Sequence, residues 1–460
     1  MIESIALENF YCFNKRTEVQ FVAGRERSRA MDEMYSGFNE QNRVNLLKMV
    51  YLYGNNGAGK SKLLMAFDTL KELVTELRDD KTDLLPYHPF ALDPTGSHHN
   101  PSHIELTYHF DGRRYRYEIV WDERTITEEN LYLLRPTTET RLIHRWHDEE
   151  TKTAQVDYDK HAMTMDDDTK YVIKTSLLRN NSVISSITKT NIYDRVLHDQ
   201  LSFFRHGFEL LDFHDIDLGD SLPDDGSTGP AQGNGRELKK VILALLKSIG
   251  SNIVNFEKIP LPKRLPQRFS SHFKSMSDDE KAMLMEWMEM SPDYAVKTFH
   301  RVGPKKVLPL DLEDQSEGTQ EILRLILCMH QAISEHKTIL LDDCINGIHP
   351  KTLEQLMKFY LGASADAQLI IASQNFSNLD DPLIRRDSLR FVIKDEQGCS
   401  HVEQLNLGDL HKNQNLRLQV ENSDRWGVKP AIDELVLEEA IAEYRQKLVY
   451  EDSFYYSELL

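Results

Sequence analysis

Residues 54–61 carry the motif from which most of the chemistry of this sequence can be inferred. The stretch reads G-N-N-G-A-G-K-S, with Gly54, Gly59, Lys60 and Ser61 at the spacing of a phosphate-binding loop. Its glycines let several backbone N–H groups point at one phosphate. Lys60 can then reach the β- and γ-phosphates of a nucleotide, and the Ser61 hydroxyl can ligate Mg²⁺. The motif predicts that ATP and Mg²⁺ are bound by Gly54, Asn55, Asn56, Gly57, Ala58, Gly59, Lys60, Ser61 and Lys62.

A second group of polar residues follows an apolar run at residues 338–341. The run T-I-L-L ends in two adjacent carboxylates, Asp342 and Asp343. If this strand lies beside the strand of the phosphate loop, Asp342 can hold Mg²⁺ opposite Ser61. Asp343 can then polarise the attacking water as a general base. Alone, the run is an ordinary strand that ends in an acidic turn, but together with the phosphate loop it predicts a catalytic magnesium site.

Two further segments are expected at the same edge of the sheet. Ser316, Gly318 and Thr319 stand at the start of an apolar-periodic helix, where backbone N–H groups favour an anion. Another apolar strand, residues 368–372, leads directly to Ser373 and Gln374. We therefore add the S-E-G-T stretch and Gln374 to the candidate site residues.

The elements that must position these residues can be recognised from their patterns. An apolar run at residues 49–53 precedes the phosphate loop and a helical pattern follows it, which is the strand–loop–helix context that the chemistry requires. Alternating runs at 103–110 and 114–121 flank Asp111-Gly112, which predicts a β-hairpin, and 130–134 adds a third strand. Helical patterns then dominate, at 192–204, 235–248 and 278–290.

Composition limits the classes of protein to consider. The 460 residues carry a net charge of −19, which argues against nonspecific coating of DNA. No apolar run approaches the roughly 18 residues of a membrane span, and no signal peptide is recognised. The four cysteines lack metal-ligand or disulfide-framework spacing, so we expect a cytoplasmic protein without a membrane partner.

The order of these motifs resembles the ABC-class ATPase heads of the SMC and DNA-repair type. It resembles more closely their compact bacterial branch of AAA ATPases, to which the RloA-like, AriA-like and OLD-like ATPases of anti-phage defence belong. The residues that carry the resemblance are N-F-x-x-F at 9–13, the phosphate loop, the 316–319 signature, L-L-D-D at 340–343, I-H-P at 348–350 and the late run 383–393.

The resemblance implies an α/β fold: an ABC-type P-loop NTPase head, with a mixed sheet, helices and an antiparallel β subdomain, and an inserted helical lid or arm domain. We expect the first half of the head at 1–145, the helical insert at 146–296, the second half at 297–422 and a helical tail at 423–460. The tail combines an acidic helix with the aromatic run F-Y-Y at 454–456, and we expect it to contact a partner or another copy.

The resemblance also implies a function. Two or more copies would associate head to tail, so that Ser316, Gly318 and Thr319 of one chain meet the ATP held by another. The ATPase would act as a sensor and scaffold that controls a separate effector, such as a nuclease, after a phage protein or DNA provides the trigger. The alternatives are an SMC-like or RecF-like ATPase of DNA repair or DNA structure, and a transporter ATPase.

Three residues depart from the family pattern. Asp343 stands where the family has a glutamate, Gln374 where it has a histidine, and Tyr11 where it has an arginine or lysine. All three positions concern the γ-phosphate or its water, whereas the residues that grip the nucleotide are intact. Since loss of a positioned general base costs about 10²–10⁴ in rate, we expect tight ATP binding and weak ATPase activity.

Overall fold

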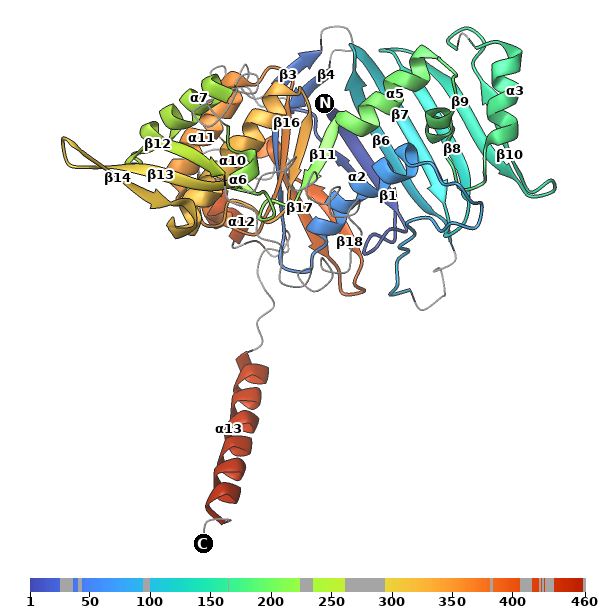
Figure 1. Ribbon diagram of the computed structural model, residues 1–460. Helices are drawn as coiled ribbons and strands as arrows, with labels where there is room; N and C mark the ends of the chain where they lie inside the picture. Colours follow the sequence, from blue (N-terminus) through green and yellow to red (C-terminus); the bar gives the residue numbers. More distant parts are fainter. Residues whose placement is uncertain are drawn as a thin grey trace, which may run out of the picture.

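Figure 1 shows the computed structural model, which contains two large sheets with helices between and around them. It describes residues 1–24, 36–39, 44–93, 100–163, 165–223, 235–260, 294–380, 384–405, 416–421, 423, 426 and 434–457. The expected helix at 278–290 lies outside these residues.

The core sheet carries the phosphate loop on one of its inner strands. Its strand order is β11-β15-β16-β5-β17-β18, and every pairing is parallel except that of β18 with β17. The strands are β11 (Phe208–Leu211), β15 (Thr338–Leu341), β16 (Gln368–Ser373), β5 (Met49–Tyr53), β17 (Leu389–Lys394) and β18 (Ser400–Gln404). All residues of β5, β15 and β16 are buried, as expected for parallel strands covered on both faces.

The second sheet is antiparallel and begins with the first strand of the chain. Its order is β10-β9-β8-β7-β6-β1-β2. The strands are β1 (Ile2–Glu8), β2 (Thr17–Gln20), β6 (Ser102–Phe110), β7 (Arg113–Trp121), β8 (Ile126–Leu134), β9 (Glu139–Asp148) and β10 (Thr153–Tyr158). Asp111 and Gly112 connect β6 to β7 with φ angles of 49° and 70°. Two successive positive φ angles suit a tight hairpin turn, so the predicted hairpin is confirmed.

Aromatic side chains join the helices to the antiparallel sheet. The helices concerned are α2 (Lys60–Thr75), α4 (Val183–Ser186) and α5 (Arg195–His206), which contact one another. Phe203 of α5 stacks on Tyr108 of β6 with ring centroids 3.8 Å apart. On the other side, Phe67 of α2 meets Phe208 of β11 edge-on at 5.9 Å. The prediction of an α/β P-loop fold with an antiparallel β subdomain is confirmed.

The segment 146–296 corrects part of the sequence prediction, because it is not wholly helical where the structure describes it. Helices occur near two expected places, at α5 and at α7 (Gly235–Ser248), and Asp194 caps α5 by accepting a hydrogen bond from Leu197 N at 3.1 Å. However, β10 extends the antiparallel sheet and β11 joins the core sheet. These short strands gain their partners from distant parts of the chain, which local periodicity does not reveal.

The remaining elements lie around the two sheets, apart from α13, which Figure 1 shows away from them. A small sheet, β12-β13-β14, lies beside α7, and a two-stranded ribbon pairs β3 with β4. These elements are β3 (Ser36–Asn39), β4 (Val44–Leu47), α3 (Asp167–Ser176), α6 (Leu218–Ser221), β12 (Ile253–Pro260), β13 (Tyr294–Val302), β14 (Lys306–Asp311), α10 (Glu317–Ser334), α11 (Pro350–Ala363), α12 (Leu416–Glu421) and α13 (Glu434–Ser457). The side chains of residues 434–445 in α13 are exposed. Among the helices that the structure describes, none has the length and apolar character needed to cross a membrane.

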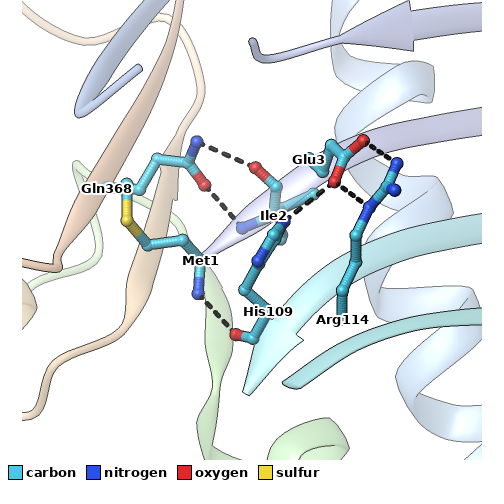
Figure 2. Close-up of polar contacts among 6 residues, drawn as sticks. All are labelled: Met1, Ile2, Glu3, His109, Arg114 and Gln368. Atoms are coloured by element: carbon cyan, nitrogen blue, oxygen red, sulfur yellow. Dashed lines mark hydrogen bonds and ion pairs between the residues drawn. The ribbon is translucent and has the colours of Figure 1, made fainter. Parts of the chain in front are cut away.

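Gln368 connects the two large sheets at one point (Figure 2). Its Oε1 accepts a hydrogen bond from Ile2 N at 2.9 Å, and its Nε2 donates to Ile2 O at 3.1 Å and to Leu47 O at 2.9 Å. Thr338 Oγ1 also donates to Gln368 Oε1, at 3.1 Å. The side chain is completely buried, so these bonds satisfy backbone groups that no water reaches.

An ion-pair network lies next to this junction, on the antiparallel sheet (Figure 2). Arg114 donates from Nε and Nη2 to the two carboxylate oxygens of Glu3, at 2.7 and 2.6 Å, and His109 Nε2 lies 2.8 Å from Glu3 Oε2. Burial by itself would raise the pKa of Glu3, but the bonds from His109 and Arg114 outweigh it and lower this pKa. The network therefore keeps Glu3 ionised at the start of β1.

Candidate functional site

The phosphate loop has a backbone conformation that favours glycine at two positions. Gly57 has a φ of 76°, and Gly59, which caps α2, has a φ of 112°. A Cβ atom on Gly59 would stand 2.6 Å from Cys12 Sγ, and one on Gly54 would stand 2.5 Å from Val392 O. Ser400 Oγ donates to Ala58 O at 2.7 Å, so the start of β18 is bonded to the loop. These contacts therefore hold the loop in a tight curve that leads into the N-terminus of α2.

Lys60 lies inside this curve. Its side chain is buried, and Nζ donates to Gly54 O at 2.7 Å and to Asn55 O at 3.2 Å. Burial lowers the pKa of Lys60, while Asp342 and Asp343 act in the opposite direction. Because its present partners are neutral carbonyl groups of the loop, the ammonium group can exchange them for the stronger bonds of phosphate oxygens.

A cavity of about 470 Å³ brings the two predicted halves of the site together. The phosphate loop and the start of α2 line it through Asn56, Gly57, Gly59, Lys60, Ser61 and Lys62. Asp342 and Asp343, which follow β15, line the same cavity. The volume falls in the range of small-molecule sites, and hydroxyl and carboxylate oxygens are the ligands that Mg²⁺ prefers. These residues therefore fit a nucleotide with its magnesium ion.

A wall of this cavity was not predicted from the sequence. It consists of Cys12, Pro89, Phe90, Ala91, Leu92, Lys394 and Gly398. Asn9 holds part of this wall, because its Oδ1 accepts from Phe90 N at 3.0 Å and its Nδ2 donates to Asn100 O at 2.6 Å. The N-F-x-x-F pattern at 9–13 was the only sequence signal for this wall. The segment 88–92, which residues 9–13 contact, carries no recognisable motif.

Tyr11 also lines the cavity, and its ring is held from two directions. It stacks on His88 with centroids 4.6 Å apart, and Lys62 Nζ lies 4.3 Å from the centre of the Tyr11 ring. Tyr11 N donates to His88 O at 2.7 Å. An uncharged aromatic ring therefore lines the cavity at the position where the sequence resemblance implies arginine or lysine.

Asp343 follows the strand β15 with an unusual backbone conformation. Its φ is 43°, and its Oδ1 accepts a hydrogen bond from Asn346 Nδ2 at 2.9 Å. Asp343 is exposed, and it lines the cavity. Asp343 is therefore accessible to a ligand, although Asn346 already engages one of its oxygens.

The other candidate residues do not line this cavity. Ser316 caps α10, and its Oγ accepts from Thr319 N at 3.4 Å. Gly318 lies in the first turn of the same helix. Gln374 directly follows β16, whose Ser373 pairs with Tyr53 of β5, so it stands near the phosphate loop but outside the lining residues. Within one chain, the cavity therefore combines the phosphate loop and the two carboxylates without the signature residues.

The model of the family described as AAA domain, putative AbiEii toxin, Type IV TA system matches residues 49–381. No curated protein matches the sequence.

Among solved structures, the chain is similar to the SMC head domain from Thermotoga maritima. The TM-score is 0.40 at 12% identity, and the match covers 88% of this chain and 99% of that one. The SmcHead bound to the C-winged helix domain of ScpA is similar with a TM-score of 0.40 at 11% identity, covering 89% and 98%.

Proposed function

We propose that this chain is an ATP-binding sensor and scaffold of an anti-phage defence system. The premise is that the chain belongs to the family described as AAA domain, putative AbiEii toxin, Type IV TA system. The observation that carries the proposal is the cavity that the phosphate loop shares with Asp342 and Asp343. The family's description points to toxin–antitoxin systems, which is in keeping with a defence role.

In this proposal the chain binds ATP with Mg²⁺ through a small set of groups. The N–H groups of residues 55–60 and the ammonium group of Lys60 bind the phosphates, and Ser61 and Asp342 hold the ion. When bound, Mg²⁺ neutralises charge on the phosphate oxygens. Asp343 is the candidate general base.

Hydrolysis is proposed to be slow, so that ATP occupancy acts as a conformational latch. Three features support this. Asp343 has a shorter side chain than glutamate and is engaged by Asn346, Gln374 cannot take up a proton, and Tyr11 brings no charge to the cavity. A turnover rate above roughly 1 s⁻¹, the low end of typical enzymes, would reject the latch.

Association is proposed to complete the site. Ser316, Gly318 and Thr319 stand at a helix N-terminus outside the cavity of their own chain, where they are suited to meet the nucleotide of another copy. The effector would be a separate protein, with a nuclease as the first candidate. Helix α13, whose residues 434–445 are exposed, is proposed as a contact for a partner or another copy.

Calorimetry with ATP and MgCl₂ tests the central claim. We expect the wild-type protein to bind, and Lys60→Ala to bind at least about 10- to 100-fold more weakly, because charge-assisted hydrogen bonds to phosphate are lost. Lys71→Ala is the matched control, since Lys71 lies on the same helix but does not line the cavity. No heat of association with the wild-type protein would overturn the proposal.

The defence role needs a separate test. Co-expression with the product of the adjacent gene should give a complex that forms with the wild-type chain and is weakened by Lys60→Ala. A neighbouring gene that encodes a repair-type phosphoesterase, together with ATP-dependent DNA binding by this chain, would instead favour the DNA-repair alternative.

A further inference from the structure

The loop at residues 343–347, directly after β15, is strained. Asp343 has a φ of 43° and Ile345 a φ of 69°, although neither is glycine. For a β-branched residue such as Ile345 this conformation is an outlier, and it persists only where the surroundings enforce it. Cys344 and Ile345 are completely buried, so packing enforces part of it.

A carboxylate from another element holds the far end of this loop. Glu321 projects from the second turn of α10 and is only 3% exposed. Its Oε2 accepts a hydrogen bond from Gly347 N at 2.9 Å. A charge-assisted bond of this kind, from a buried carboxylate, is stronger than a neutral one.

The first turn of α10 also touches the loop directly. A Cβ atom on Gly318 would stand 2.9 Å from Gly347 O, and one on Gly347 would stand 2.8 Å from Glu321 Oε2. Neither glycine has a positive φ, so close approach is what requires glycine here. Because the helix and the loop are in contact at two points, a displacement of one must move the other.

We propose that Glu321 is a positioning residue that clamps the 343–347 loop to α10, so that the place of the Asp343 carboxylate depends on the place of the signature residues. The consequence of this inference rests on the proposed function. When Ser316 and Gly318 contact another copy, a displacement of α10 would move Asp343 in the cavity of the same chain. Asp343 stands at one end of the clamped loop and Gly318 stands against the other.

Hydrogen–deuterium exchange on the nucleotide-free full chain tests the clamp itself. We expect Glu321→Ala to accelerate exchange of the amides at 344–348 by about tenfold, since Gly347 N–H loses its acceptor. Glu321→Gln keeps an acceptor oxygen and should stay near the wild type. The control is Glu354→Gln on α11, which removes a carboxylate paired only with a lysine in the described contacts, Lys351 at 2.8 Å, and should leave the loop unchanged.

A second variant tests whether faster exchange in Glu321→Ala comes only from the cavity left by the lost side chain. In Gly347→Ala the new methyl group would displace Glu321, so the same loss of protection is expected with no cavity created. Wild-type exchange at 344–348 in both Glu321→Ala and Gly347→Ala would overturn the clamp, and so would equal acceleration in Glu321→Gln and Glu321→Ala.

The consequence for function is measured separately. With ATP and Mg²⁺, Glu321→Ala should keep its affinity within about threefold, because Lys60, Ser61 and Asp342 are untouched, while the single-turnover rate falls at least severalfold. If the wild-type chain binds no ATP, the proposed function fails but the exchange result stands. If ATP binds normally and the single-turnover rate of Glu321→Ala equals that of the wild type, only the coupling is wrong.

Discussion

In the proposed function, Asp343 and Gln374 decide how fast a bound ATP is hydrolysed. The carboxylate of Asp343 is one methylene shorter than that of a glutamate and already accepts a bond from Asn346 at 2.9 Å. Gln374 follows β16 and has no titratable group. Neither residue contributes to the grip on the phosphates, so binding and turnover should respond independently to changes at these positions.

The double variant Asp343→Glu/Gln374→His is expected to hydrolyse ATP about 10²-fold faster than the wild type. The longer carboxylate reaches further toward the water, and a histidine supplies a group that can take up a proton. Steady-state phosphate release measures the rate, and calorimetry should show an unchanged ATP affinity. A rate within twofold of the wild type would mean that these departures do not limit hydrolysis.

Strands β1 and β16 belong to different sheets, and Gln368 is a direct hydrogen-bonded link between them. It binds both backbone groups of Ile2 and the carbonyl of Leu47 from a completely buried position. A buried backbone group that loses its partner carries the full cost of desolvation. This amide therefore contributes to the relative placement of the two sheets.

Gln368→Ala is expected to lower the free energy of unfolding by about 2–4 kcal/mol, because backbone groups of Ile2 and Leu47 lose their partners and a small cavity remains. Urea unfolding followed by circular dichroism measures the change. Gln155→Ala is the control, since the side chain of Gln155 makes only an exposed hydrogen bond to Thr153 among the described contacts, and it should stay within about 0.5 kcal/mol. Equal midpoints for the two variants would contradict the role of Gln368.

At the scale of the whole molecule, the proposed function requires that two or more chains associate. The signature residues lie outside the cavity of their own chain. In the proposed head-to-tail arrangement, a chain by itself therefore presents an incomplete site. A nucleotide bound between two copies would add contacts that exist only in the assembly. The mass in solution should therefore depend on ATP and Mg²⁺.

Ser316→Arg is expected to prevent this ATP-dependent increase in mass while leaving ATP affinity within about threefold. The arginine would add bulk and charge at the N-terminus of α10, where the dipole disfavours a cation. Light scattering with and without ATP and Mg²⁺ measures the mass, and calorimetry provides the control for binding. A variant that still gains mass as the wild type does would argue against a head-to-tail arrangement.

The predictions that succeeded from the sequence rest on local pattern. The strand at 338–341 was predicted with the bounds of β15, and the hairpin at Asp111-Gly112 was predicted in the correct place. Both depend on residues that are neighbours in the chain, such as an apolar run or two turn residues. The helical prediction for 146–296 failed in part because β10 and β11 pair with strands that local pattern does not identify.

By itself, the sequence determined the phosphate loop, the strand and helix around it and the pair of carboxylates, because each is a chemical pattern within about ten residues. Only the tertiary structure decided that residues 89–92 wall the cavity, that Gln368 joins the sheets and that Glu321 reaches Gly347. These contacts join side chains to backbone groups far away in the chain. Backbone N–H and carbonyl groups are the same in nearly every residue. A pattern of residue types therefore cannot show which backbone group a buried side chain will contact.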